Sequence, residues 1–195
     1  MTTAPSPARP VAQLVSDWLE PRTWVTGTGL LIGWHAGRLA GAGWAMLAVL
    51  AGTVLPAMVI SRGVRRGRYA DRHITNRSQR LPVLLFVLAC VAACLGLLTL
   101  AGAPRAVIAL TITMAAAITV LTAVTAVWKI SIHCAVCSGG ATILVITFGL
   151  AVAPVYLLVA LASWSRVALR EHTTAQAIAG VAAGAASALI YLALR

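Results

Sequence analysis

The sequence predicts an all-α, polytopic membrane protein, a helical bundle of six or seven transmembrane helices. Three observations lead to this prediction. Apolar residues make up 61% of the 195-residue chain and charged residues only 10%, a balance that does not suit a water-soluble globule. Apolar runs near the length that crosses a bilayer as a helix recur from Trp24 onward. Segments that alternate apolar and polar residues are not seen, so helices rather than a β-barrel are expected.

Seven apolar runs divide the chain, and each predicts one helix. The first, 24–37, is short and rich in glycine, and without it the count falls to six. The remaining runs are 39–60, 82–101, 106–128, 133–150, 151–164 and 174–194. A turn around Gly149–Pro154 separates the fifth run from the sixth. We expect residues 22–195 to form a single integral-membrane domain.

The N-terminus differs from the rest of the chain. It reads MTTAPSPARP, which is polar and rich in proline, and the first apolar run starts too late for an ordinary secretory signal. Residues 1–21 are therefore predicted to form a short disordered or interfacial arm.

The chain is strongly basic, with a formal charge of +11 and seven arginines between Arg62 and Arg80. The positive-inside rule assigns this loop to the cytoplasm, where anionic lipid headgroups would attract it. Arginines that bind a substrate anion should not be counted under this rule. The sequence therefore does not decide on which side of the cell membrane the reactive face lies. Nucleic acid is not expected as a partner, because no soluble domain or aromatic stacking surface accompanies the basic run.

The four cysteines do not indicate a metal site. Cys134 and Cys137 form a single C-x-x-C, whereas a closed zinc site needs four ligands and no second pair lies nearby. Cys90 and Cys94 lie within an apolar run, where free cysteine behaves as a small hydrophobe. Neither a metal nor another cofactor is predicted.

Three polar blocks each precede an apolar run. They are DRHITNRSQR before Leu81, Lys129 with His133, and SRVALREHTTAQ before the last run. Two spans fit between Arg80 and His133, and a helical hairpin fits between His133 and Arg166. All three blocks are therefore predicted to lie at one face of the membrane. Taken singly, each could also be a charged loop or an interfacial turn.

The composition of this predicted face suits an anion. It combines arginines, one lysine and two or three histidines with almost no carboxylates, and arginine grips phosphate bidentately. Helix N-termini at His133 and near His172 would add amide donors. Two histidines beside a phosphate suggest one nucleophile and one proton donor. The spacing of His172 and Gln176 predicts that they share a helical face.

At these residues the sequence resembles the type 2 phosphatidic acid phosphatase superfamily, membrane lipid phosphatases related to vanadium haloperoxidases. The family's motifs read K-x6-R-P, P-S-G-H and S-R-x5-H-x3-D. The third is matched by Ser165-Arg166, His172 and Gln176, with glutamine in place of aspartate. The second is matched by Ser131 and His133 without the proline and glycine, and the first by His73 and Arg80, followed by Leu81-Pro82.

The resemblance implies a phosphatidic acid phosphatase/haloperoxidase-like helical core and a role for each matched residue. His172 would attack phosphorus, and His133 would protonate the leaving alcohol and then activate water. Arg80, Arg166 and Ser131 would bind the phosphoryl oxygens. His73 or Lys129 would replace the charge of the first-motif lysine. Gln176 accepts the hydrogen bond of the nucleophilic imidazole but lacks the charge of the family's aspartate.

The predicted function is a metal-independent membrane phosphatase acting on a prenyl or phosphatidyl lipid phosphate or diphosphate. The alternative is a membrane protein or scaffold that binds phosphate lipids with impaired catalysis. A transporter is less favoured because no internal repeat is found, and a prenyltransferase because its paired aspartates are missing.

Overall fold

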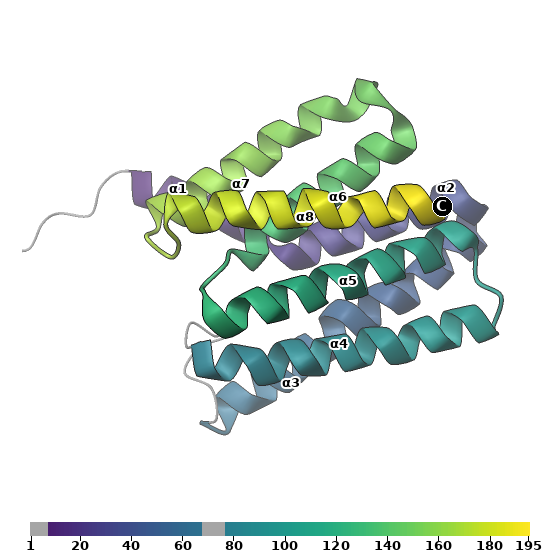
Figure 1. Ribbon diagram of the computed structural model, residues 1–195, viewed down its shortest axis with the longest axis horizontal. Coiled ribbons are helices and arrows are strands. Elements are labelled where there is room, and N and C mark those ends of the chain that lie inside the picture. Colours follow the sequence, from purple (N-terminus) through teal and green to yellow (C-terminus); the bar gives the residue numbers. More distant parts are fainter. Residues whose placement is uncertain (1–7, 68–76) are drawn as a thin grey trace, which may run out of the picture.

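Helices form all of the regular structure in the part of the chain that is described, which confirms the all-α prediction. The computed structural model describes residues 8–67 and 77–195, with only the backbone of residues 8 and 77–80. In chain order the elements are α1 (Ala8–Trp18), α2 (Pro21–Val49), η1 (Leu50–Val54), α3 (Leu55–Arg65), α4 (Arg77–Leu100), α5 (Arg105–Val127), α6 (Ile132–Phe148), η2 (Leu150–Val155), α7 (Tyr156–Ala168) and α8 (Thr174–Leu194). η1 is a π-helical turn and η2 a 3₁₀ segment. Figure 1 shows the long helices side by side in one bundle.

Residues 1–21 are predicted from the sequence to form a disordered or interfacial arm, and the described part of this segment is helical. Residues 8–18 form α1, which packs against α7. Ala12 and Ser16, four residues apart, are buried, whereas Val11, Leu14 and Trp18 are exposed. A helix that buries one face against the bundle is therefore part of the folded domain.

α2 contains a chain reversal, and its two arms hold the predicted run 24–37 and the first part of the run 39–60, which continues through η1 into α3. Gly37 and Arg38 leave the helical conformation, and Arg38 has a φ of 54°. The two arms pack so closely that a Cβ on Gly41 would overlap the carbonyl oxygen of Gly33. The predicted boundary between 24–37 and 39–60 is therefore confirmed. In Figure 1 this reversal lies at the right end of the bundle.

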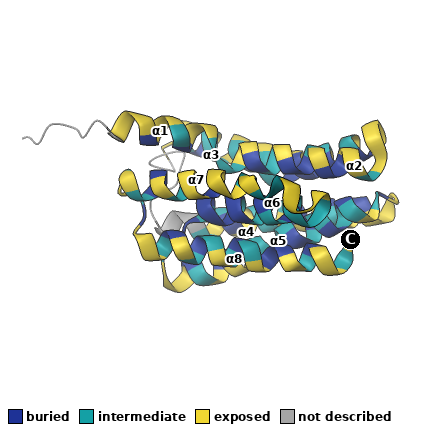
Figure 2. Cartoon of the chain, turned by 90° about the horizontal axis from the view of Figure 1, so that it is seen from above, coloured by how far each residue is buried: buried dark blue, intermediate teal, exposed yellow. Residues whose placement is uncertain are grey.

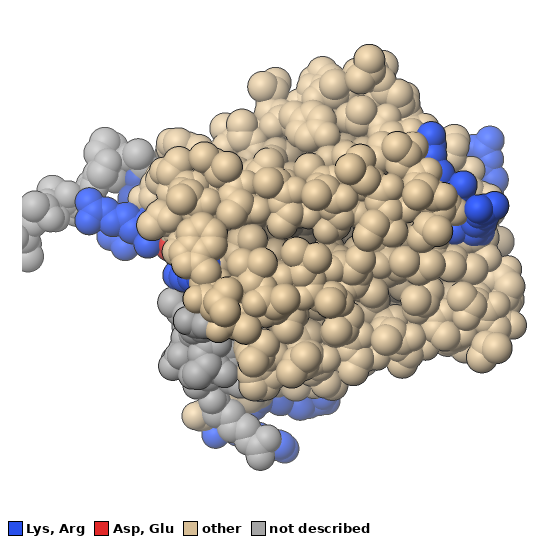
Figure 3. Space-filling view, in the orientation of Figure 1, with Lys and Arg blue, Asp and Glu red and all other residues tan. Residues whose placement is uncertain are grey.

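The described helices are those of an integral membrane protein. Five helical stretches are long and apolar enough to cross a membrane, and they are Arg9–Arg65, Leu81–Leu100, Arg105–Val127, Leu150–Ala168 and Thr174–Leu194. α6 is apolar but shorter, with 17 residues. Large apolar side chains are exposed along the bundle, including Leu39 and Leu157. Figure 2 shows exposed residues along the outer faces of the helices, and Figure 3 shows a broad uncharged face between charged groups at the two ends. A hydrocarbon environment accounts for both features.

The closest helix pair is α6 with α8. A Cβ on Gly180 would overlap the carbonyl oxygen of Ser131, and a Cβ on Gly184 would overlap that of Ala135. Small residues four apart let two backbones approach in this way, as in membrane helix pairs of the G-x-x-x-G type. Ser138 adds a hydrogen bond from its Oγ to the backbone oxygen of Val181, at 2.8 Å. This packing holds the N-termini of α6 and α8 next to each other.

The described parts of the three polar blocks reach the same end of the bundle, as predicted from the lengths between them. α4 starts there, α5 ends and α6 starts there, and α7 ends and α8 starts there, which Figure 1 shows at the left. Gly149, with a φ of 83°, ends α6 and opens the turn into η2 at the opposite end. The predicted turn at Gly149–Pro154 is thereby confirmed.

We predict that Gly184→Ala destabilises the protein by about 1–3 kcal/mol, because the new Cβ forces α8 away from α6. Gly43→Ala is the matched control, since a Cβ there meets no atom within 4 Å, and alanine is the better helix former. Thermal unfolding in detergent measures both. Equal melting temperatures for the two variants would contradict the close-packing account.

Candidate active site

Ser131 begins α6 and places His133 in its first turn. The Ser131 side chain accepts a hydrogen bond from the backbone N–H of Cys134 at 3.4 Å, so it is the N-cap. Its own backbone N–H donates to the carbonyl oxygen of Gln176 at 3.2 Å, which joins this turn to α8. Ser131 is completely buried and does not line the cavity described below. Its observed role is to start the helix.

Thr173 and Gln176 begin α8 in a reciprocal capping box. Thr173 Oγ1 accepts from the Gln176 backbone N–H at 3.3 Å, and Gln176 Oε1 accepts from the Thr173 N–H at 3.1 Å. His172 lies in the loop before the helix, so the expectation that His172 and Gln176 share a helical face is wrong. The capping box brings them together instead, with Gln176 Oε1 3.3 Å from His172 Nδ1.

These contacts fix the neutral tautomer of His172. The Thr173 N–H can only donate, so the Gln176 atom that faces it is the oxygen, and the same oxygen faces His172 Nδ1. An amide oxygen only accepts, so Nδ1 carries the hydrogen and Nε2 keeps its lone pair. An amide oxygen, rather than a carboxylate, thus selects the Nδ1–H tautomer.

A cavity of about 660 Å³, here called the outer cavity, opens at this end of the bundle. His133, Arg166 and His172 line it together, although they belong to α6, to α7 and to the loop before α8. Each is more than nine-tenths buried. Asp17, Glu20 and Arg22 also line this polar mouth, and the remaining lining residues are mostly apolar.

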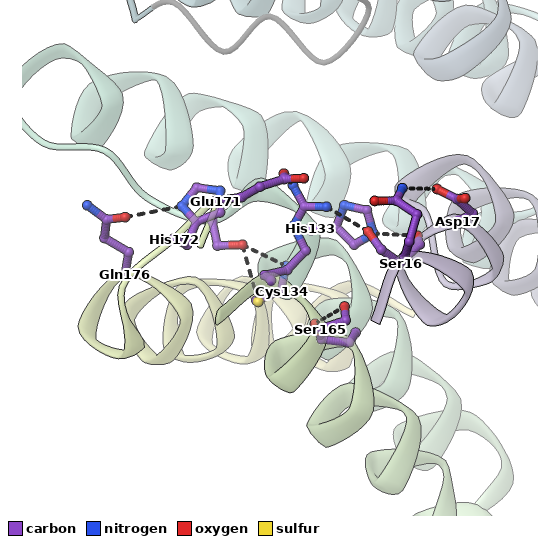
Figure 4. Close-up of polar contacts among 12 residues, drawn as sticks. Ser16, Asp17, His133, Cys134, Ser165, Glu171, His172 and Gln176 are labelled. Atoms are coloured by element: carbon purple, nitrogen blue, oxygen red, sulfur yellow. Dashed lines mark hydrogen bonds and ion pairs between the residues drawn. The ribbon is translucent and has the colours of Figure 1, made fainter. Parts of the chain in front are cut away.

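α1 supplies a residue that the sequence did not single out, Ser16. Arg166 Nη1 donates to Ser16 Oγ at 2.6 Å, and His133 Nε2 lies 3.2 Å from the Ser16 carbonyl oxygen. A carbonyl only accepts, so His133 carries a hydrogen on Nε2. Figure 4 shows Ser16 of α1 reaching the same cluster as His133, Glu171 and His172. The four-residue spacing of Ala12 and Ser16 is the signal that could have revealed this face.

Carboxylates are more prominent at this end than the sequence suggested. Glu171 forms an ion pair with Arg166, and Asp17 and Glu20 line the cavity mouth. Glu171 also fixes the loop through its backbone, because its carbonyl oxygen accepts from Lys129 Nζ at 2.7 Å. Lys129 precedes α6, does not line the cavity and holds the loop that carries His172.

Two predicted anion-binding residues fall at or beyond the limits of the description. His73 lies outside the described residues. The backbone of Arg80 lies in the first turn of α4 at the polar end, and its side chain is not described. Of the predicted site residues, the structure brings His133, Arg166, His172 and Gln176 together.

No protein-family model matches the chain, and comparisons with curated proteins and with solved structures find no significant match.

We predict that neutral His172 is hydrogenated on Nδ1. Long-range ¹H–¹⁵N spectra of ¹⁵N-histidine-labelled protein in detergent report which ring nitrogen carries the hydrogen. Gln176→Leu removes the hydrogen-bond acceptor of Nδ1–H, so the Nε2–H tautomer of His172 should become populated. His35→Ala, at the opposite end of the bundle, should leave the His172 signals unchanged. An Nε2-hydrogenated ring in the unsubstituted protein would contradict the assignment.

Proposed function

We propose that the protein is an integral-membrane, metal-independent phosphatase of a lipid phosphate or diphosphate, prenyl or phosphatidyl in type, with a phosphatidic acid phosphatase-like core. One observation carries the proposal: His133, Arg166 and His172 line a single cavity whose mouth is polar and whose interior is apolar. A phosphate group suits the mouth and a hydrocarbon chain suits the interior.

His172 is the proposed nucleophile. Its Nε2 lone pair attacks phosphorus, the bond from phosphorus to the lipid oxygen breaks, and a phosphohistidine forms. His133, protonated on both ring nitrogens, gives its Nε2 proton to the departing oxygen, so that the lipid alcohol leaves neutral and His133 becomes a neutral imidazole. Water then attacks the phosphohistidine, and His133 takes its proton as phosphate departs. Gln176 holds Nδ1–H and thereby keeps the lone pair on Nε2.

Arg166 is the proposed phosphate-binding arginine, with Arg80 as a second. The Arg166 guanidinium contacts Glu171 and Ser16. A phosphate dianion would displace both, since its oxygens replace the carboxylate and hydroxyl as acceptors. The His133 N–H, which donates to the Ser16 backbone carbonyl, would exchange that acceptor for the leaving oxygen.

The alternative is a non-catalytic protein that binds phosphate lipids, and the uncharged Gln176 favours it. The family's aspartate stabilises the charged imidazole, and by analogy with catalytic triads its loss costs about 10⁴ in rate. Gln176→Asp distinguishes the two functions. If the unsubstituted protein is an active enzyme, it has a measurable rate and the substitution raises that rate. If it is a non-catalytic binder, it has no activity and the substitution creates it.

We predict that purified protein releases phosphate from one or more of a panel of lipid phosphates with EDTA present. His172→Ala should lower kcat by about 10³-fold or more, because the nucleophile is lost. His35→Ala is the control, since His35 lies at the opposite end beside Phe148. Equal phosphate release by His172→Ala and unsubstituted protein would defeat the proposal.

We further propose a multi-pass protein of the cell membrane with seven crossings and its polar mouth on the cytoplasmic side. Of the thirteen lysines and arginines within residues 8–67 and 77–195, three belong to the opposite end, and they are Arg38, Arg105 and Arg195. Figure 3 shows a basic group at that end, on the right. Removing the proposed phosphate-binding Arg80 and Arg166 from the count leaves the imbalance intact, so the positive-inside rule gives one orientation.

The orientation is tested with two alanines at opposite ends of α8, Ala175 and Ala193, both exposed. Each is changed to cysteine in a variant whose four native cysteines are replaced. An impermeant maleimide should label Ala193→Cys in intact cells and Ala175→Cys only after permeabilisation. The reverse pattern would place the cavity mouth outside the cell.

A further inference from the structure

A second cavity lies deeper in the bundle than the outer cavity. This inner chamber has a volume of about 100 Å³ and apolar walls from α2, α5, α6 and α8. The two spaces share five lining residues, Val25, Met114, Ala117, Leu121 and Val136. They are therefore neighbours with common walls rather than separate sites.

Met114 lies where the two spaces meet, against the π-helical turn η1. A Cβ added to Gly52 of η1 would lie 2.8 Å from Met114 Cε, so the methionine packs on the bare glycine backbone. π-helical turns inside longer helices often mark functional sites. Both residues line the outer cavity, and Met114 also lines the inner chamber. The Met114 side chain is thus part of the wall that the two spaces share.

The distance from the polar end of the bundle to Met114 is close to the length of a lipid chain. Met114 precedes the polar end of α5 at Val127 by thirteen residues, and Gly52 precedes the polar end of α3 at Arg65 by the same number. Thirteen residues of helix rise about 20 Å. One leaflet of hydrocarbon is about 15 Å deep. A chain whose head lies at His133 and His172 would reach Met114 after about one leaflet.

The wall between mouth and floor suits hydrocarbon. Below the polar residues it is formed by side chains such as Ile60, Val87, Ile118 and Leu121. Apart from the hydroxyls of Thr53 and Ser61, the lining side chains of α3, η1, α4 and α5 are apolar. The Thr53 hydroxyl donates a hydrogen bond to the Val49 carbonyl oxygen at 2.6 Å, so its hydrogen does not point into the cavity.

We propose that the outer cavity binds one hydrocarbon chain of the lipid phosphate and that Met114 sets the longest chain it accepts. This specificity role rests on the proposed function for its head group. Shortening Met114 joins the inner chamber to the outer cavity. A cavity of about 150 Å³ accommodates benzene, so the added 100 Å³ provides room for about four further carbon atoms.

The test is a graded series of single-chain lipid monophosphates, assayed with unsubstituted protein, Met114→Ala and Ala117→Leu. Met114→Ala should raise kcat/KM for chains longer than the normal optimum by about tenfold or more relative to short chains. Ala117→Leu, which adds volume to a shared wall, should shift the optimum to shorter chains. Met58→Ala is the matched control, because Met58 is 44% exposed and lines neither cavity.

Binding is measured in parallel by displacement of a fluorescent single-chain alkyl phosphate, which requires no catalysis. If no protein releases phosphate but the displacement profiles shift as expected, the phosphatase proposal fails and the chain-length role stands. If phosphate is released and the chain-length profile of Met114→Ala equals that of Met58→Ala, the chain-length role is overturned. A lengthened optimum in Met58→Ala would overturn it equally.

Discussion

The close approach of α6 and α8 is the constraint on which the rest of the site depends. Gly180 and Gly184 present bare backbone to the carbonyls of Ser131 and Ala135, and in a membrane such contact contributes through van der Waals packing rather than hydrophobic burial. Since both helices begin at the same end, their N-terminal turns become neighbours. The hydrogen bond from the Ser131 N–H to the Gln176 carbonyl then ties one helix start to the other.

A second layer of contacts orients the rings. Gln176 closes the capping box of α8 and with the same oxygen accepts from His172, so one side chain starts the helix and sets the tautomer. Ser16 joins Arg166 to His133 from the other side. The polar groups are therefore held at the cavity mouth by Gln176, which belongs to the third motif, and by Ser16, which lies outside the motifs. Buried polar side chains need such partners, because in a low-dielectric surrounding an unpaired group is costly.

Much of this arrangement could be predicted from the sequence, because hydropathy and chain length between polar blocks are strong constraints in a membrane. The chain reversal at Gly37 and Arg38, the turn after Gly149 and the shared end of the three blocks were all accessible in this way. The roles of α1 and Glu171 were not. α1 is too short and polar to register as a span, and the pairing of Glu171 with Arg166 depends on a loop conformation in which Arg170 has a positive φ.

The most direct test of the central claim, that two histidines from separate helix starts act on one bound phosphate, is chemical trapping of the intermediate. Protein mixed briefly with a labelled lipid phosphate is quenched under alkaline conditions, digested and analysed by mass spectrometry. The account predicts phosphate on His172 in the unsubstituted protein and none on any histidine in His172→Ala, which lacks the nucleophile. Phosphate on another residue, or turnover with no phosphorylated histidine in either protein, would contradict it.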